Sequence, residues 1–376
     1  MQRKFLDIKK RAAALFLAFL LTVSLAACHT EKSKTSTEEI VAETLIPEEK
    51  KYPYDLKEYI TLPSPLGIKA DFDPVLSCEE EEIDQAIFQI LLGSATFEGE
   101  NAVVGFSDRV TVDYTVLLQG EVLEGEGGKD EKVVVGLDTG NGIHKALSDI
   151  LQGKSVGSDC YVEYTYPDSE FYDELAGKTV LIQVTVKKSE AAKMKEFNQE
   201  FVRSMKGYET YTVEEFRKKL RKDILKEKEQ EQSLAVWEAF CADVKVIAYP
   251  ETETDAYRSD YANYYQGLAN SVGMPFAQFL EEYMEMSVVE FEEEAFRYAR
   301  EMVKNDMIFT QLIRQLELKL SYEEYQLGLE AYYVEEKDKF SSLEEFVQYY
   351  TESQIRENLI RDKVLHYLVE NAIPTE

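Results

Sequence analysis

The sequence predicts an α+β fold in which a small antiparallel β-module is followed by a mostly helical domain. The β-module is predicted because the segment Tyr166–Lys188 ends in a strand whose alternate residues are apolar, namely Val180, Ile182, Val184 and Val186. The helical domain is predicted because, after Ser189, long stretches follow a helical period and are punctuated by capping signals. We expect the β-module over residues 106–189 and the helical domain over residues 190–376.

Composition limits the classes of function. The 376 residues suffice for two or three domains, and 44% of them are hydrophobic, so most of the chain is expected to fold. A formal net charge of -30 argues against nucleic-acid binding, because phosphates would be repelled. No cofactor is expected, since no metal-site spacing relates the residues that could ligate one, which are His29, His144, His366, Cys78, Cys160 and Cys241.

Residues 1–27 resemble a bacterial lipoprotein signal peptide. A basic start is followed by the apolar run Ala12–Leu25, which is short for a membrane span, and then by Leu-Ala-Ala-Cys ending at Cys28. The resemblance implies that Cys28 receives a lipid and anchors the protein at the extracytoplasmic face of the cell membrane. An uncleaved anchor helix is the alternative. Residues 28–53, rich in Glu, Lys, Thr and Ser, are expected to form a flexible tether.

Residues 54–105 are expected to lead into the β-module. Tyr54–Asp73 alternates and contains two prolines, which favours an extended segment. Ser77–Leu92 has a helical apolar period, with Ser77 and Glu80 as a possible capping box. Within the module itself we predict strands and one short helix, in the order Val110–Tyr114, Lys132–Val135, Ile143–Leu151 (the helix) and Tyr161–Tyr166.

Helix starts in the C-terminal half share one pattern, in which Ser or Thr is followed three residues later by Glu or Gln. The pattern occurs at Thr212 with Glu215, Ser287 with Glu290, Ser321 with Glu324, Ser342 with Glu345, and Thr351 with Gln354. We expect long helices over Val213–Val236 and Val288–Leu320. The sequence contains no Walker loop, nucleophile-elbow motif or zinc signature, which disfavours nucleotide-driven, hydrolytic and zinc-dependent activities.

The order of these elements resembles trigger factor without its first domain, and the β-module resembles an FKBP-type peptidyl-prolyl isomerase. The similarity runs from Asp55 to Ala372 and includes DLKEYITL, the helix Val213–Val236, GMPFAQFLEEY, IRDKVLHYLVENA and the Tyr166–Lys188 end of the module. The Gly-Phe-Arg-x-Gly-Lys loop by which trigger factor docks on the ribosome is absent from the sequence. The resemblance therefore implies a chaperone of exported polypeptides, without a ribosome partner.

Prolyl isomerisation, which the resemblance also implies, asks for an apolar pocket and for no nucleophile, metal or cofactor. Its barrier is the amide resonance, about 18–20 kcal/mol, and the twisted amide has less charge separation than the planar one. Carried over position by position, the family's pocket falls on Tyr114, Leu123, Glu124, Ile143, His144, Leu147, Phe171 and Ile182. Leu123, Leu147 and Ile182 stand where the family has aromatic rings, so weak or vestigial activity is expected. For these three, core packing is an equal alternative.

The resemblance implies distinct roles for the other pocket positions. Tyr114 and either Phe171 or Tyr172 would form aromatic walls. Glu124 would be the acidic partner of the pocket, and His144 would offer its backbone N–H to the ligand. Ile143 would complete the apolar wall.

Aromatic and methionine side chains crowd the helical half, and both suit promiscuous contact with unfolded chains. The candidates for client contact are Tyr257, Tyr261, Tyr264, Phe276, Phe279, Tyr283 and Met284. Ordinary packing between helices is the alternative for each. Together these features predict a lipid-anchored, ATP-independent folding factor for unfolded or proline-containing exported polypeptides. The alternative is a solute-binding or adhesion lipoprotein without catalytic activity.

Overall fold

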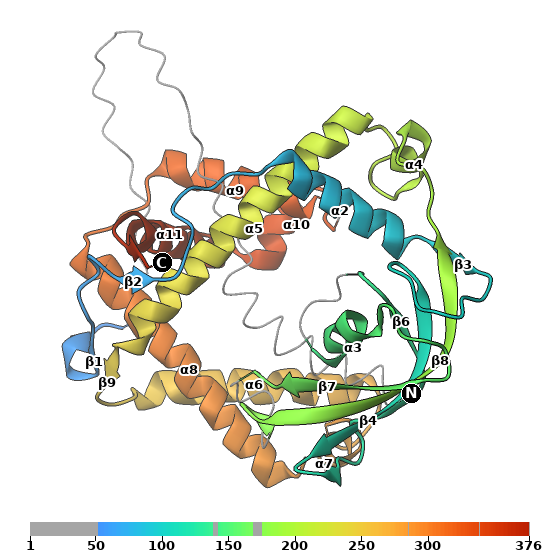
Figure 1. The fold of residues 1–376 in the computed structure, drawn as a ribbon. Coiled ribbons are helices and arrows are strands. Elements are labelled where there is room, and N and C mark those ends of the chain that lie inside the picture. Colours follow the sequence, from blue (N-terminus) through green and yellow to red (C-terminus); the bar gives the residue numbers. More distant parts are fainter. Residues whose placement is uncertain (1–51, 138–141, 168–174, 285, 338, 376) are drawn as a thin grey trace. The chain divides into compact units, whose positions relative to one another are not determined.

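The computed structural model describes residues 52–137, 142–167, 175–284, 286–337 and 339–375 (Figure 1). These residues form two compact units. The β-unit comprises Ser77–Ile224, and the helical unit comprises residues 52–76 together with the chain from Leu225 onwards. Helices and sheets are both present, which confirms the predicted α+β class. The units divide the chain at other residues than the expected domain boundaries. The predicted signal peptide, Cys28 and nearly all of the tether lie outside the described residues.

The β-unit is a six-stranded sheet with helices around it (Figure 1). Its elements are α2 (Glu80–Gly93), β3 (Thr96–Glu98), β4 (Arg109–Leu118), β5 (Glu121–Val122), β6 (Gly128–Val134), α3 (Ile143–Leu151), β7 (Asp159–Thr165), β8 (Thr179–Lys193), α4 (Gln199–Ser204) and the start of α5 (Val213–Ala242). All strand pairs are antiparallel. β8 pairs with β4 along one side and with β7 and β3 along the other, and β4 also pairs with β5 and β6.

The core of the β-unit lies between the sheet and α3. Val180, Ile182, Val184 and Val186 are at most 1% exposed, as the period of two along β8 predicts. They pack with the valines of β4 and with Leu147 and Leu151 of α3. The helix Ile143–Leu151 has the bounds that the sequence predicts. β8 continues past residue 189, the expected end of the β-module, to Lys193 by pairing with β3.

The start of α2 differs from the prediction. The capping residue is Glu79, whose partner in the capping box is Glu82, and not Ser77 with Glu80. Glu80 is instead within the first turn, where it bonds Arg217 at 2.6 Å. Asp84, one turn later, bonds the same guanidinium at 2.8 Å. A carboxylate can cap a helix as Ser does, so the paired glutamates outcompeted the serine.

The helical unit contains eleven further pieces of regular structure within the described residues, plus the end of α5. They are η1 (Leu56–Glu58), β1 (Ile60–Thr61), β2 (Lys69–Ala70), β9 (Lys245–Val246), α6 (Glu251–Ser271), α7 (Phe276–Tyr283), α8 (Val288–Gln315), α9 (Tyr322–Glu336), α10 (Leu343–Tyr350), α11 (Glu352–Glu370) and β10 (Ile373–Pro374). The two long helices are confirmed, although α5 runs on to Ala242 and α8 already ends at Gln315.

The predicted capping signals mark real helix starts. Ser287 and Ser321 form reciprocal capping boxes, and so does Thr212 with Glu215 at the start of α5. Ser342 and Thr351 accept the expected backbone N–H at the starts of α10 and α11. The Glu345 carboxylate instead accepts a hydrogen bond from the backbone N–H of Ser341, so only half of this capping box is formed.

The segment before residue 76 completes the helical unit. Tyr52, Leu56 and Ile60 are at most 2% exposed and belong to one core cluster with residues of α5, α8 and α11. Arg314 of α8 donates to the backbone carbonyls of Tyr52 and Tyr54. β1 pairs with β9, and β2 with β10, which ties this segment to both ends of the helical region. No helix among the described residues is both long enough and apolar enough to cross a membrane.

Candidate functional site

The predicted pocket residues divide by burial. Tyr114, Leu123 and Ile143 are half-buried and pack against the core of the β-unit. Leu147 and Ile182 are 0% exposed and are part of that core. Glu124 and His144 are exposed. Phe171 and Tyr172 lie outside the described residues. Tyr114, Leu123 and Ile143 therefore border the core to which Leu147 and Ile182 belong.

Tyr114 lies where a glycine makes room for its ring. A Cβ on Gly128 of β6 would come within 2.5 Å of the Tyr114 Cε1 atom, so only glycine fits opposite this tyrosine. Leu123 is held nearby because its N–H donates to the carbonyl of Val116 at 2.9 Å. That bond folds the chain after β5 back against β4.

Two further tyrosines pack at the same core, where Tyr164 is half-buried and Tyr166 is 5% exposed. Their rings meet edge to face at 5.0 Å between centroids. The Tyr166 hydroxyl donates to Glu126 Oε2 at 3.1 Å. Burial raises the pKa of Tyr166, and the charge of Glu126 and the nearby Tyr114 hydroxyl raise it further, so Tyr166 stays a neutral donor.

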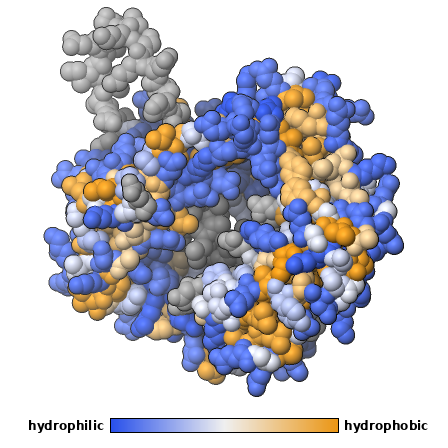
Figure 2. Space-filling view, viewed as in Figure 1, coloured by the Kyte–Doolittle hydropathy of each residue, from blue (hydrophilic) through white to orange (hydrophobic). Residues whose placement is uncertain are grey.

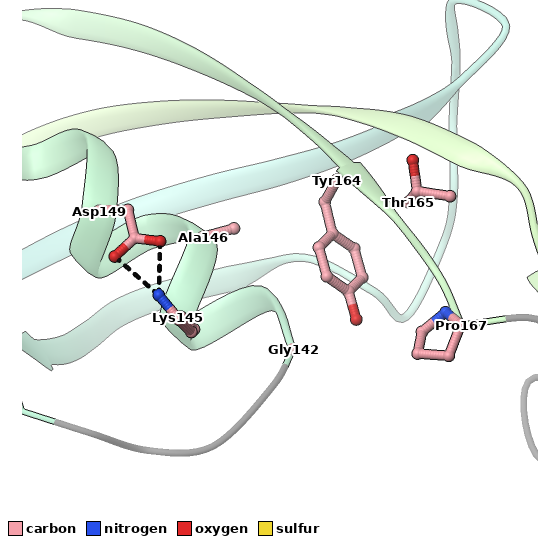
Figure 3. A pocket seen from close by; sticks show the side chains of 7 residues that line it. All are labelled: Gly142, Lys145, Ala146, Asp149, Tyr164, Thr165 and Pro167. Carbon is pink, nitrogen blue, oxygen red and sulfur yellow. Dashed lines mark hydrogen bonds and ion pairs between the residues drawn. The ribbon is translucent and has the colours of Figure 1, made fainter. Parts of the chain in front are cut away.

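A shallow depression of about 260 Å³ lies between α3 and the end of β7 (Figure 3). It is lined by Gly142, Lys145, Ala146, Asp149, Tyr164, Thr165 and Pro167. The Tyr164 ring projects from β7 into the space between α3 and Pro167 (Figure 3). On α3, Lys145 Nζ bonds Asp149 Oδ2 at 2.8 Å, at half-exposed positions. Because its side chain is small, Ala146 leaves space on α3 beside the Tyr164 ring.

This arrangement can hold an apolar segment with polar groups beside it. Tyr164, Ala146 and Pro167 supply apolar walls to the depression, and Lys145, Asp149 and Thr165 supply polar ones. No group of three His, Cys, Asp or Glu within the described ranges could hold a metal ion. The sequence reasoning missed Tyr164 and Tyr166 as site residues. The signal was available, because both continue the inward alternation of Cys160 and Val162 along β7.

The seven predicted client residues lie mostly inside the helical unit. Tyr261, Phe279 and Met284 are buried between α6, α7 and α8. Phe276 and Tyr283 are half-buried against the same cluster, and Tyr257 is half-buried on α6. Of the seven, only Tyr264 is exposed, at 47%. The structure thus favours the core-packing alternative for most of this set.

Other apolar side chains of the helical unit are exposed. Near the paired helices α6 and α8 they are Tyr264, Val272, Val288, Val289 and Phe296. Figure 2 shows exposed apolar side chains as separate areas on a largely hydrophilic surface. Isolated apolar side chains are ordinary on protein surfaces, whereas grouped ones mark contact sites.

Comparison with known protein families gives a match in the helical part of the chain. Residues 212–370 match the family model described as "Bacterial trigger factor protein (TF) C-terminus". The chain is 27% identical over 314 residues to a trigger factor of Psychrobacter sp. (strain PRwf-1), an alignment that covers 79% of this chain. That alignment is longer than the family match and so includes residues outside it. The chain spans 66% of that relative's length.

One solved structure is also similar in part. It is described as "Promiscuous Substrate Recognition in Folding and Assembly Activities of the Trigger Factor Chaperone". The superposition covers 83% of this chain and 72% of the other, with 17% identity and a TM-score of 0.34.

Proposed function

We propose that this protein is an ATP-independent folding factor whose helical unit binds unfolded polypeptides. The observation that carries the proposal is the match of residues 212–370 to the trigger factor C-terminus. The exposed apolar side chains of α6 and α8, which include Val289 at 68% and Phe296 at 37%, support it as the contact surface. This proposed surface differs from the client-contact residues expected from the sequence, because most of those residues pack between the helices.

The chaperone proposal is tested by light scattering from a reduced, unfolded client. We expect the full chain to suppress aggregation at equimolar concentration without added nucleotide. A client that aggregates at the same rate in stoichiometric excess of the protein would refute the proposal.

The second part of the proposal is an FKBP-like prolyl isomerase activity in the β-unit. The half-buried Tyr114 and Tyr164 offer apolar surface on which a proline ring can rest, and the Tyr164 ring packs on the buried Tyr166. Such a surface favours the twisted amide over the more polar planar one. Leu147 and Ile182, which stand where the family has aromatic rings, are aliphatic and fully buried, so these positions offer no aromatic ring to the ligand. We therefore propose slow catalysis, at a rate below that of a pocket with aromatic floor residues.

The isomerase proposal is tested with a short proline peptide in a protease-coupled assay. We expect the full chain to accelerate the reaction, and Tyr114→Ala to lose at least tenfold of that acceleration. Tyr161→Ala is the matched control, because Tyr161 is 54% exposed on the opposite face of the sheet. Equal losses in both variants, or no acceleration by the wild-type chain, would remove the isomerase from the proposal.

The third part is location. We propose that Cys28 carries a lipid and that the protein acts on exported polypeptides outside the cytoplasm, without the ribosome. The lipobox-like Leu-Ala-Ala-Cys after a basic and apolar start supports it. Metabolic labelling with a fatty acid is expected to mark the wild-type protein and not Cys28→Ser. A label retained by the variant would refute lipidation at Cys28.

The alternative of a solute-binding receptor finds less support. Such receptors require repeated strand-helix units in two lobes. After β8 the described residues form only two-residue strands among long helices.

A further inference from the structure

The outer face of the sheet, which points away from the core, carries an exposed apolar strip. It consists of Val122 on β5, Leu117 on β4, Leu181 on β8 and Tyr161 on β7. Val122 is 59% exposed, Tyr161 54% and Leu181 40%, and Leu117 is half-buried between them. An antiparallel sheet with one covered face normally carries polar residues on the other. Grouped apolar residues at these positions therefore require a separate explanation.

The strand register makes the strip continuous. Leu117 pairs with Val122 on one side and with Leu181 on the other, so these three side chains stand in one row across three strands. Tyr161 pairs with Gln183, which places its ring diagonally beside Leu181. Diagonal neighbours lie within reach of an aromatic side chain. Four strands at a spacing of about 4.8 Å give the strip a length of roughly 14 Å, which about five residues of extended chain can span.

The charges around the strip are acidic. Glu163 of β7 pairs with Leu181, and Asp159, two residues before Tyr161, lies on the same face of β7; both carboxylates are exposed. Lys187, a cation on the same face of β8, is already bonded to Asp113 at 3.3 Å and to Asp130 at 2.6 Å. The chain as a whole carries a formal net charge of -30. A partner with basic side chains next to apolar ones would complement this face, whereas an acidic partner would be repelled.

We propose that this strip binds extended polypeptide segments in which apolar residues alternate with lysine or arginine. The site lies on the opposite face of the sheet from the candidate isomerase surface. Apolar side chains of the segment would cover Val122, Leu181 and Tyr161, while its cations would approach Asp159 and Glu163. The class of partner rests on the proposed chaperone function. The site itself would select basic clients before or during contact with the helical unit.

The test uses the full chain and a fluorescein-labelled twelve-residue peptide of alternating leucine and lysine, with binding followed by anisotropy. The variant carries Val122→Thr, Tyr161→Thr and Leu181→Thr, because threonine retains the strand propensity. Val156→Thr is the matched control, since Val156 is 37% exposed and lies in the turn before β7. We expect at least tenfold weaker binding by the triple variant and unchanged binding by the control. A peptide with glutamate in place of lysine is expected to bind at least tenfold more weakly than the lysine peptide.

Several outcomes would overturn the proposal. They are equal binding of the lysine peptide by wild type and triple variant, equal binding of both peptides by wild type, and no binding by a wild-type chain that still suppresses aggregation. The last would leave the chaperone proposal intact, so the two failures can be told apart. Sedimentation of the wild type as a dimer that the triple variant abolishes would identify the strip as a contact between copies, which also overturns it. Turnover of the short proline peptide by the triple variant verifies that its β-unit is folded.

Discussion

The two units differ in how their tyrosines are used. In the β-unit, Tyr114 and Tyr164 are half-buried against an aliphatic core, whereas Tyr166 is 5% exposed and donates to Glu126. In the helical unit, tyrosine hydroxyls donate to carboxylates on neighbouring helices. Tyr261 of α6 donates to Glu294 of α8, and Tyr332 of α9 donates to Asp362 of α11, both at 2.5 Å. Abundant tyrosine is therefore no guide to a binding surface by itself, because a buried ring with a bonded hydroxyl joins helices.

One such junction includes an ion pair. Asp306 of α8 is 1% exposed and accepts bonds from Tyr257 of α6 and Arg361 of α11. The guanidinium of Arg361 also lies 5.0 Å from the centroid of the Phe309 ring. Three helices of this unit therefore meet at one carboxylate. Trp237, the only tryptophan of the chain, stacks on Phe309 at 4.3 Å and so reports on this junction by fluorescence.

The largest effect is expected from Asp306→Ala. The substitution removes the buried partner of Arg361 and leaves its guanidinium with the more exposed Glu357, which costs about 3–5 kcal/mol of the free energy of unfolding. Urea unfolding followed by Trp237 fluorescence measures it. The double variant Asp306→Leu with Arg361→Met is expected to recover most of the loss, since it removes both charges. A loss below about 1 kcal/mol for the single variant would contradict a structural role for this carboxylate.

A second large effect is expected in the segment before the β-unit. Leu56→Ala should lower the free energy of unfolding of the helical unit by about 2–5 kcal/mol, because Leu56 is 0% exposed in its core. Leu66→Ala is the control in the same segment, with Leu66 55% exposed. If both variants unfold at the same urea concentration as wild type by Trp237 fluorescence, this segment is not part of the helical unit.

The sequence predicted regular elements better than it predicted their partners. Periodicity and capping chemistry are local, so β8, α3 and the helix starts at Ser287 and Ser321 were within reach. The role of residues 52–76 could not be predicted from local patterns, because Leu56 packs with helices more than 170 residues away along the chain. Likewise, an aromatic stripe at helical spacing fits a core and a surface equally well. A carboxylate on the neighbouring helix, such as Glu294 opposite Tyr261, shows that the stripe belongs to the core.

A medium effect is expected from Leu147→Phe, which restores an aromatic ring at the floor position of the isomerase surface. Leu147 is fully buried, so the larger ring should overpack the core and cost about 1–3 kcal/mol of β-unit stability. The loss should appear in urea unfolding by far-ultraviolet circular dichroism and not by Trp237 fluorescence. A variant that is as stable as wild type and isomerises the proline peptide faster would instead make position 147 part of an open pocket.

A pH dependence of the helical unit is also expected. Burial raises the pKa of Asp362 to about 7; the hydrogen bond from Tyr332 opposes this rise and the charge of Glu335 adds to it. The native state thus retains a proton that the unfolded state has lost between about pH 4 and pH 7. Stability should fall as the pH rises through this range. Asp362→Asn should flatten the change in urea midpoint between pH 5 and pH 8, measured by Trp237 fluorescence. An identical pH dependence in both proteins would exclude Asp362 as its source.

The division between exposed client-binding side chains and tyrosines that join helices is tested most directly by comparing aggregation suppression by two variants of α6 and α8. Val289→Ser with Phe296→Ser removes exposed apolar side chains, whereas Tyr261→Phe removes only a hydroxyl that joins the helices. Scattering from a reduced, unfolded client at equimolar protein is the measurement. We expect the serine variant to lose most of the suppression and Tyr261→Phe to retain it below its own unfolding transition. Full suppression by the serine variant, with loss in Tyr261→Phe, would contradict the division between surface and junction.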